Sequence, residues 1–183
     1  MIKQVVVLML AGLTLLGGAC RKKEATAPAP VRPQARAMLR PTLGNAVVGH
    51  LEMANEGNKV HITGEVSGLR KKGEHGFHIH EMGDCSGPDG KTAGEHFAPL
   101  GHPHGPPGAQ ATHHTGDFGN LSADQNGVAH VDVWTELPLL TAGQHYVVGR
   151  SFIVHEGKDG LTTQPSGNAG ARVACGVIEA ATP

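Results

Sequence analysis

Short runs in which apolar and polar residues alternate cover most of the chain beyond residue 35. Alternation with a period of two is typical of β-strands with one buried face, and these runs are also enriched in valine and isoleucine. Turns rich in glycine and asparagine, such as NEGN, DQNG and KDG, separate the runs. The runs that we expect to form strands are 35–40, 46–53, 59–69, 75–81, 127–134, 145–156 and 171–180.

No convincing long helical period accompanies these runs, so the pattern predicts an all-β fold, either an antiparallel sandwich or a Greek-key barrel. Residues 82–114 fit neither pattern. About thirty residues without regular structure are uncommon in a compact domain unless they are functional or tied down. This stretch holds a cysteine and several histidines, so we expect a metal and a disulfide to order it (Cys85, His96, His102, His104, His113 and His114).

The first twenty residues have the features of an export signal. Lys3 supplies a positive charge, and residues 5–16 form an apolar run that is short for a bilayer span. The sequence LLGGAC at 15–20 resembles a bacterial lipobox, in which Cys20 is lipidated, although Gly17 stands where a leucine is usual. We therefore predict a signal peptide over 1–19 and a lipid anchor at Cys20, with conventional signal cleavage as the alternative.

A linker and a folded domain are predicted to follow. Residues 20–34 are charged and then rich in alanine and proline, which is typical of an extended, disordered linker. Residues 35–183, the expected domain, carry ten Lys and Arg against fifteen Asp and Glu. A nucleic-acid-binding domain needs a basic patch in its folded part, so nucleic acid is not an expected partner. Arg21 is not the aspartate associated with inner-membrane retention, which favours an outer-membrane anchor facing the periplasm.

Thirteen histidines among 183 residues are the first indication of metal chemistry. His78 and His80 alternate in one predicted strand, so both point to one side while Phe77 and Ile79 point to the core. Imidazole ligands suit copper and zinc. The ligand types alone predict one or two sites for such metals, with further candidates elsewhere in the chain (His96, His104, His114, Asp117 and His155).

Five segments in order resemble the copper,zinc superoxide dismutase family: GFHIHEMGDC, AGEHFAPLGHPHGPPG, HHTGDFGNLSAD, GRSFIVHEGKDG and GNAGARVACGVI. The resemblance covers roughly residues 35–180. It implies an eight-stranded antiparallel Greek-key barrel, related to the immunoglobulin-like sandwich, with a long metal-binding loop. It also implies one copper and one zinc per subunit and dismutation of superoxide to dioxygen and hydrogen peroxide, protecting the cell envelope from extracytoplasmic superoxide.

The resemblance also assigns residues. The implied copper ligands are His78, His80, His96 and His155. The implied zinc ligands are His96, His104, His114 and Asp117, so that His96 bridges the two metals. Arg172 matches the arginine that docks superoxide beside the copper, and with His96 it is the expected catalytic residue. Asp159 matches a carboxylate that holds a copper ligand and a zinc ligand together, and Cys85 and Cys175 match the family disulfide.

Several alternatives stay open at this level. His102 and His113 lie next to two expected ligands, whereas the remaining histidines are expected to bind no metal (His50, His61, His75, His130 and His145). A copper-delivery protein of similar fold would lack a copper ligand or Arg172, and a structural surface lipoprotein would show losses in the zinc set. Neither loss is present. The sequence leaves open whether the chain is a monomer or a homodimer.

Overall fold

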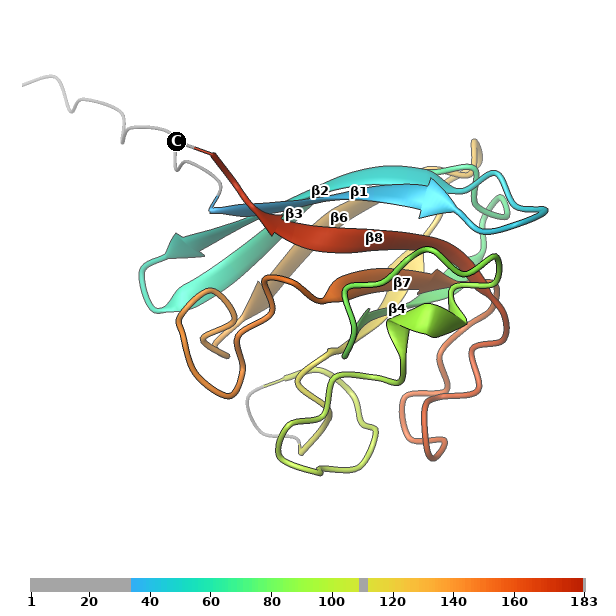
Figure 1. Ribbon diagram of the computed structural model, residues 1–183. Coiled ribbons are helices and arrows are strands. Elements are labelled where there is room, and N and C mark those ends of the chain that lie inside the picture. Colours follow the sequence, from blue (N-terminus) through green and yellow to red (C-terminus); the bar gives the residue numbers. More distant parts are fainter. Residues whose placement is uncertain (1–33, 109–111, 183) are drawn as a thin grey trace, which may run out of the picture. The chain divides into compact units, whose positions relative to one another are not determined.

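The computed structural model describes residues 34–108 and 112–182, which contain eight β-strands and one 3-10 helix (Figure 1). The predicted signal peptide, Cys20 and the linker up to residue 33 lie outside this range. The strands are β1 Ala35–Pro41, β2 Val48–Glu56, β3 Lys59–Ser67, β4 Glu74–His80, β5 Asp117–Ser122, β6 Ala129–Thr135, β7 Ser151–His155 and β8 Arg172–Ala180, and the helix η1 is Lys91–Ala93.

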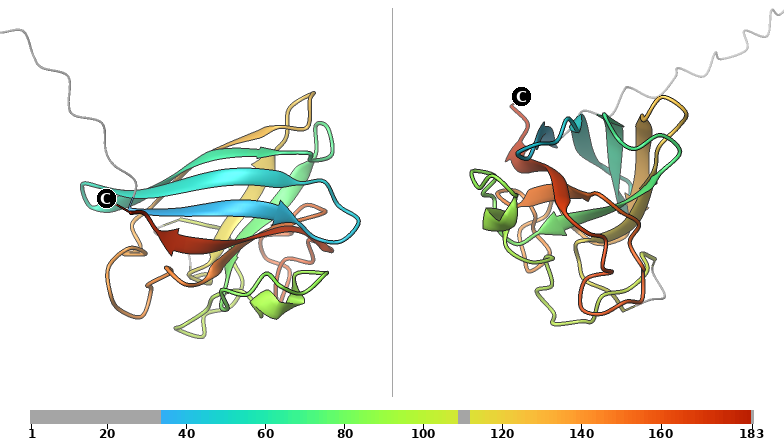
Figure 2. Two further views of the ribbon diagram at one scale, coloured as in Figure 1. Left: turned by 45° about the horizontal axis from the view of Figure 1, so that its top comes forward. Right: turned by 90° about the vertical axis from the view of Figure 1, so that its right-hand side faces the viewer.

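All eight strands belong to one antiparallel sheet with the order β5-β4-β7-β8-β1-β2-β3-β6. The two end strands, β5 and β6, approach each other, so the sheet curls into a nearly closed barrel (Figure 2). The neighbours β3 and β6, and likewise β4 and β7, are not consecutive in the chain, as expected for Greek-key connections. The eight-stranded antiparallel barrel implied by the resemblance is therefore confirmed.

The strand pattern predicts seven of the eight strands. It misses β5, because its sequence DFGNLS contains glycine and asparagine and its apolar residues do not alternate with polar ones. It also extends β7 too far towards the N-terminus. Residues 145–150 form turns, with the Arg150 N–H donating to the Val147 carbonyl (3.0 Å), and Gly149 adopts φ +88°. That left-handed backbone ends the extended run before Ser151.

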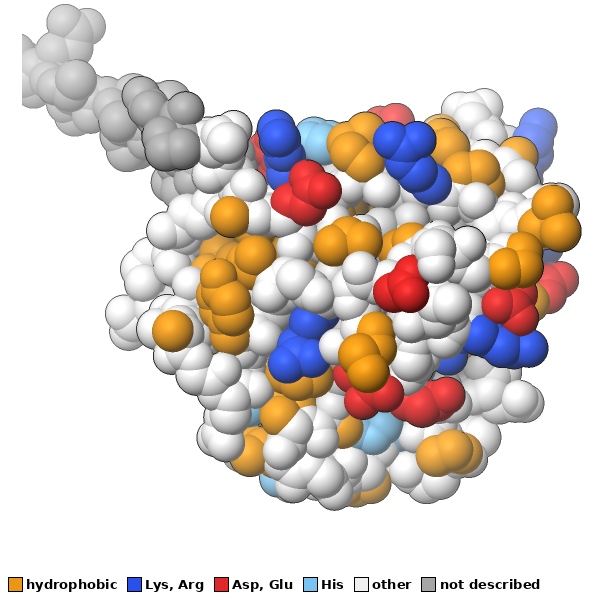
Figure 3. All heavy atoms as spheres, viewed as in Figure 1, with side chains coloured by type: hydrophobic (Ala, Val, Ile, Leu, Met, Phe, Trp, Pro, Cys, Tyr) orange, Lys and Arg blue, Asp and Glu red, His pale blue; other side chains and the backbone are white. Residues whose placement is uncertain are grey.

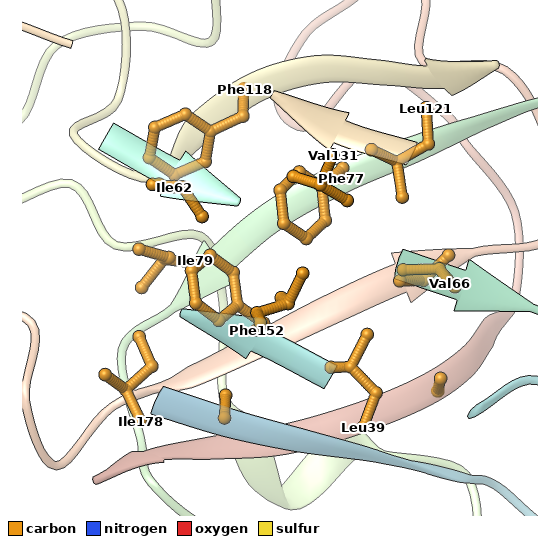
Figure 4. Close-up of a cluster of buried hydrophobic side chains, with 14 of the residues drawn as sticks. Leu39, Ile62, Val66, Phe77, Ile79, Phe118, Leu121, Val131, Phe152 and Ile178 are labelled. Carbon is orange, nitrogen blue, oxygen red and sulfur yellow. The ribbon is translucent and has the colours of Figure 1, made fainter. Parts of the chain in front are cut away.

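The barrel interior is filled by aliphatic side chains around a group of phenylalanines (Figure 4). Phe77 stacks on Phe152 with their ring centroids 5.1 Å apart, and Phe118 lies 6.0 Å from Phe77. Phe77 and Ile79 are fully buried there, which confirms the core position predicted for them. His78 and His80 alternate with these two residues, so the packing of β4 directs both imidazoles away from this core.

The long segment between β4 and β5 contains no strand in its described residues, as predicted, and is fastened to the barrel at several points. Cys85 forms a disulfide with Cys175 of β8, with a Cα–Cα distance of 5.7 Å. Near η1, the Met82 N–H donates to the Ala93 carbonyl (2.9 Å), and the Ser151 hydroxyl donates to the Met82 carbonyl (2.7 Å). The predicted disulfide is confirmed, and it anchors the segment to the last strand.

Within the described residues, no helix has the length and apolar character needed to cross a membrane. On the face shown in Figure 3, basic side chains are interspersed with acidic ones. A surface of this kind differs from the continuous basic patch that marks a nucleic-acid interface.

Removing the disulfide tests its structural role. The bond closes a loop of 90 residues, and loop-closure entropy alone predicts a stabilisation of about 4–5 kcal/mol. We expect the double variant C85S/C175S to unfold at a lower urea concentration, with the loss reaching about this size. Chemical denaturation of the metal-free protein measures it, with the Cys20→Ser variant as the control. An unchanged midpoint in the double variant would contradict the role assigned here.

Candidate metal centre

Four imidazoles converge at the end of β4. His78 and His80 belong to β4, and His155 is the last residue of the neighbouring strand β7. His96 comes from the long loop, which is bound to β4 through a bridge between His80 and His96 and a hydrogen bond from the Phe97 N–H to the Ile79 carbonyl (2.9 Å). One ring nitrogen from each of the four histidines lies within 4.8 Å of the others.

The hydrogen bonds of these rings determine which nitrogen is free. His80 Nδ1 donates to the Gly94 carbonyl (2.9 Å), and His155 Nδ1 donates to the Gly170 carbonyl (3.1 Å). Because a carbonyl only accepts, each ring carries its proton on that side and presents a lone pair on the other. His78 is held similarly, since its Nε2 donates to Asp159 Oδ2 (2.7 Å).

The opposite nitrogens are buried and have no hydrogen-bond partner among the described residues (His78 Nδ1, His80 Nε2, His96 Nε2 and His155 Nε2). Buried polar atoms are almost always paired, so four unpaired nitrogens facing one another call for a ligand. Four imidazole nitrogens suit copper. These residues therefore fit the metal that the sequence predicts for them.

A second cluster shares His96. His96 Nδ1 lies 2.8 Å from Asp117 Oδ1, and His114 Nδ1 lies 3.2 Å from the same oxygen. His104 Nδ1 lies 3.0 Å from Asp117 Oδ2 but is not in hydrogen-bonding geometry with it. This is expected for two metal-ligating atoms that face the same ion. Three imidazoles and one carboxylate, with ligand atoms within 4.8 Å of one another, form a donor set suited to tetrahedral zinc.

Backbone N–H groups of the long loop fix the position of the Asp117 carboxylate. It begins β5, and its Oδ2 accepts hydrogen bonds from the N–H groups of Gly105 (3.1 Å) and His114 (3.0 Å). Gly116, just before it, donates to the Phe97 carbonyl (3.0 Å), and a Cβ at Gly116 would collide with the Ile79 carbonyl. The backbone of β4 and of the loop thus approaches Asp117 closely, which brings the carboxylate next to His96.

Asp159 connects the two clusters. Its Oδ2 accepts from His78 Nε2, and its Oδ1 accepts from His104 Nε2 (2.8 Å). The carboxylate is fully buried, and its own backbone is bound to the side chain of Asn120 in β5. A Cβ at Gly167, where φ is +76°, would collide with this carboxylate. The arrangement orients one ring of each cluster through the same side chain.

Burial favours the neutral form of three of the four histidines in the first cluster. Burial lowers the pKa of His78 to about 4 and that of His155 to about 3, and it also lowers the pKa of His80 well below the ordinary 6.5. Burial alone would raise the pKa of Asp117, but hydrogen bonds from His114 and His96 outweigh it and lower the pKa. Metal ligands must be deprotonated, so both effects prepare the clusters for cations at neutral pH.

Arg172 begins β8 and pairs in register with His155. Its Nη1 donates to the Gly90 carbonyl (2.9 Å), and its Nη2 lies 3.8 Å from Glu95 Oε1. Burial lowers its pKa, although the neighbouring Glu95 and Asp89 act in the opposite direction. The structure therefore brings Arg172 beside His155, one of the four converging histidines.

The neighbouring histidines are not part of either cluster among the described residues. His102 and His113 lie outside both, and His113 Nδ1 instead donates to the His114 carbonyl (2.6 Å). His75 is expected from the sequence to bind no metal, but the sequence does not indicate that it contacts the backbone of His155. Its Nδ1 donates to the carbonyl of His155 (2.9 Å) from 80 residues away in the chain. An alternating strand pattern could reveal that His75 is buried but not which atom it contacts.

Comparisons with known proteins agree on one family. The family model for copper/zinc superoxide dismutase (SODC) matches residues 47–178. The chain is 42% identical over 142 residues to "Superoxide dismutase [Cu-Zn] 2" of Mesembryanthemum crystallinum, covering 73% of this chain and 88% of the relative. It is 42% identical over 151 residues to "Superoxide dismutase [Cu-Zn]" of Candida glabrata, covering 79% and 96%. A similar match links it to "Extracellular superoxide dismutase [Cu-Zn]" of Haemonchus contortus, 42% over 137 residues, covering 72% and 73%.

Replacing Asp159 by Asn tests the connection between the clusters. His78 Nε2 and His104 Nε2 bond to different oxygens of Asp159, and in D159N one of these oxygens becomes an NH2 group, which cannot accept a hydrogen bond. We expect D159N to bind zinc about ten- to a hundredfold more weakly, measured by competition with a chromophoric chelator. The control is D132N, because Asp132 lies on the exposed side of β6, away from both clusters. Equal zinc affinity in D159N and the wild type would refute this role.

The lowered pKa values also predict how the metal-free protein responds to acid. Between pH 6.5 and about 4, the unfolded chain protonates His78 and His155 while the folded chain does not, so stability falls as the pH falls. At pH 5 this costs about 2 kcal/mol for each of these histidines. His61 acts the other way, because hydrogen bonds to Glu56 and Asp132 overcome burial and raise its pKa.

We therefore expect a lower urea midpoint for the metal-free protein at pH 5 than at pH 7.5. Denaturation curves at several pH values, with a chelator present throughout, measure the difference. A midpoint that stays constant or rises on acidification would show that the buried imidazoles are not held neutral.

Proposed function

The chain belongs to the copper/zinc superoxide dismutase family, and we propose that it converts superoxide to dioxygen and hydrogen peroxide with one copper and one zinc per subunit. The observation that carries the proposal is the pair of clusters sharing His96, with unpaired buried nitrogens on the copper side. Copper would be held by His78, His80, His96 and His155. Zinc would be held by His96, His104, His114 and Asp117.

The two metals divide the chemistry. When bound, copper supplies the alternation of oxidation state through which one superoxide is oxidised and the next reduced. The polypeptide has to hold four nitrogens in a geometry that leaves room for a small anion. Hydrogen bonds to the carbonyls of Gly94 and Gly170, and to Asp159, orient three of the four rings. The remaining ring, His96, is oriented from the zinc side by Asp117.

His96 is proposed as the proton donor. Reduction of superoxide to hydrogen peroxide requires two protons, and a buried site needs a group that can hold one near the substrate. Nδ1 of His96 faces Asp117, whereas its buried Nε2 faces the other three copper ligands and has no hydrogen-bond partner in the described part of the chain. Nε2 is therefore the atom at which His96 would hold and release one proton, and solvent would supply the second.

Arg172 is proposed to dock the anion. Its guanidinium stays charged at working pH and offers several donors in a plane. The side chain is 14% exposed, and its Nη1 is fixed on the Gly90 carbonyl. The segment 160–167 carries no charged residue, so Arg172 is the basic residue to which we assign capture of superoxide.

Two other functions require losses that the chain does not have. A copper-delivery protein would be expected to lack a copper ligand or Arg172. A structural lipoprotein with a degenerate site would be expected to lack members of the zinc set. The described residues hold both sets within 4.8 Å, which favours the enzyme.

We further propose export and anchoring at the outer membrane through lipidated Cys20, with protection of the cell envelope as the role. The disulfide Cys85–Cys175 supports an oxidising compartment, and the name of the Haemonchus contortus relative includes the word extracellular. Incorporation of labelled palmitate by the wild type but not by Cys20→Ser would test the anchor. Sedimentation of the mature protein would decide between monomer and homodimer.

Dismutase activity is the direct test of the function. We expect the mature protein, loaded with copper and zinc, to inhibit superoxide-dependent reduction of nitroblue tetrazolium and to contain one copper and one zinc per chain. Chelation should abolish this inhibition, and restoring copper to the zinc-loaded protein should recover it. A protein that binds both metals and still shows no dismutation would rule out the enzyme and favour the copper-delivery alternative.

A further inference from the structure

A surface cavity of about 520 Å³ lies next to Gly170, whose carbonyl accepts a hydrogen bond from His155. Its lining includes Arg172 and three other charged residues, Asp89, Lys91 and Glu95. The ammonium of Lys91 lies 3.0 Å from the carboxylate of Asp89, so these two opposite charges largely cancel. Arg172 and Glu95 are then the charges that decide how this cavity receives an anion.

Glu95 lies next to two of the expected copper ligands, His80 and His96, through its place in the chain and a backbone hydrogen bond. It directly precedes His96, and its carbonyl accepts a hydrogen bond from the N–H of Glu81, next to His80 (2.9 Å). Its carboxylate lies 3.8 Å from the Nη2 of Arg172. Arg172 in turn pairs in register with His155. A negative charge therefore lies at short range from the guanidinium proposed to capture superoxide.

The stability of the fold does not account for this carboxylate. The Glu95 side chain is 80% exposed, and an exposed ion pair of this length contributes little to stability. Its charge, however, acts on any anion that approaches Arg172 from solvent. Two unit charges about 4 Å apart in water interact by an amount that corresponds to about a fivefold change in an equilibrium constant, and salt reduces this.

We propose that the charge of Glu95 weakens the capture of small anions by Arg172. The carboxylate partly cancels the positive potential of the guanidinium, and it repels anions that approach Arg172 through the cavity. This inference rests on the proposed function, because it assumes that an anion reaches the copper-side cluster past Arg172. Removing the charge of Glu95 should therefore strengthen anion binding and speed the reaction without changing how the metal is held.

The test uses the metal-loaded protein and the isosteric variant Glu95→Gln. At an ionic strength of about 10 mM, we expect kcat/KM for superoxide to rise about threefold. The dissociation constant of azide, followed by the copper–azide charge-transfer absorption, should fall by a similar factor. Both gains should largely disappear at about 1 M salt, where the Debye length is about 3 Å.

Glu179→Gln is the matched control. Glu179 is exposed and lies in the same strand as Arg172, seven residues further along, which is about 23 Å in a β-strand. The Glu179→Gln variant removes the same unit of negative charge, but far from Arg172. Charges about 23 Å apart in water interact about six times more weakly than charges about 4 Å apart, and salt weakens the interaction further, so azide affinity and kcat/KM should stay within about 20% of the wild type at low salt.

The outcomes separate this inference from the proposed function. An active wild type whose Glu95→Gln variant behaves like Glu179→Gln would overturn the inference and leave the function intact. A changed electron paramagnetic resonance spectrum of the bound copper in Glu95→Gln would also overturn it, because Glu95 would then act by positioning His96. If the wild type itself does not dismute superoxide, the proposed function fails, and this inference fails with it.

Discussion

The organisation of this protein depends on buried imidazole nitrogens that have no hydrogen-bond partner among residues 34–108 and 112–182. Leaving one polar atom buried and unpaired costs roughly 1–3 kcal/mol, and the described residues contain five such nitrogens within the two clusters. The fold tolerates them because the opposite nitrogen of each ring is fixed by a carbonyl or a carboxylate, so the rings cannot turn to find other partners. Metal binding would convert this unfavourable arrangement into a stabilising one.

The barrel and the loops make different contributions to that arrangement. β4 lies between β5 and β7, and the packing of Phe77 and Ile79 against the core determines the direction of His78 and His80. The long loop contributes ligands but few apolar side chains, so it depends on attachments: the bridge between His80 and His96, the disulfide, and the hydrogen bonds to Asp117 and Asp159. These attachments link loop order to metal binding, since the same residues serve both.

Much of this could be predicted from the sequence, and the missing parts have physical reasons. Alternation of apolar and polar residue types in the sequence finds β4, although six of its seven residues are buried. It misses β5, because the sequence DFGNLS has no such alternation. The family motifs identify the ligand set, because metal geometry constrains residue types at defined spacings. The contact from His75 to the His155 carbonyl and the Glu95–Arg172 pair left no such signal. Both join segments 77 or more residues apart, and their partners need not follow a motif.

The effect of the protein's charges on an approaching anion depends on the distance over which those charges act. The predicted domain carries ten basic against fifteen acidic residues, which by itself would repel an anionic substrate. At physiological ionic strength, however, charges beyond about 8 Å of Arg172 are largely screened. Capture of superoxide therefore depends on Arg172, the few groups near it and the bound metals. The acidic residues elsewhere can favour solubility without slowing the reaction, whereas Glu95 is close enough to Arg172 to oppose it.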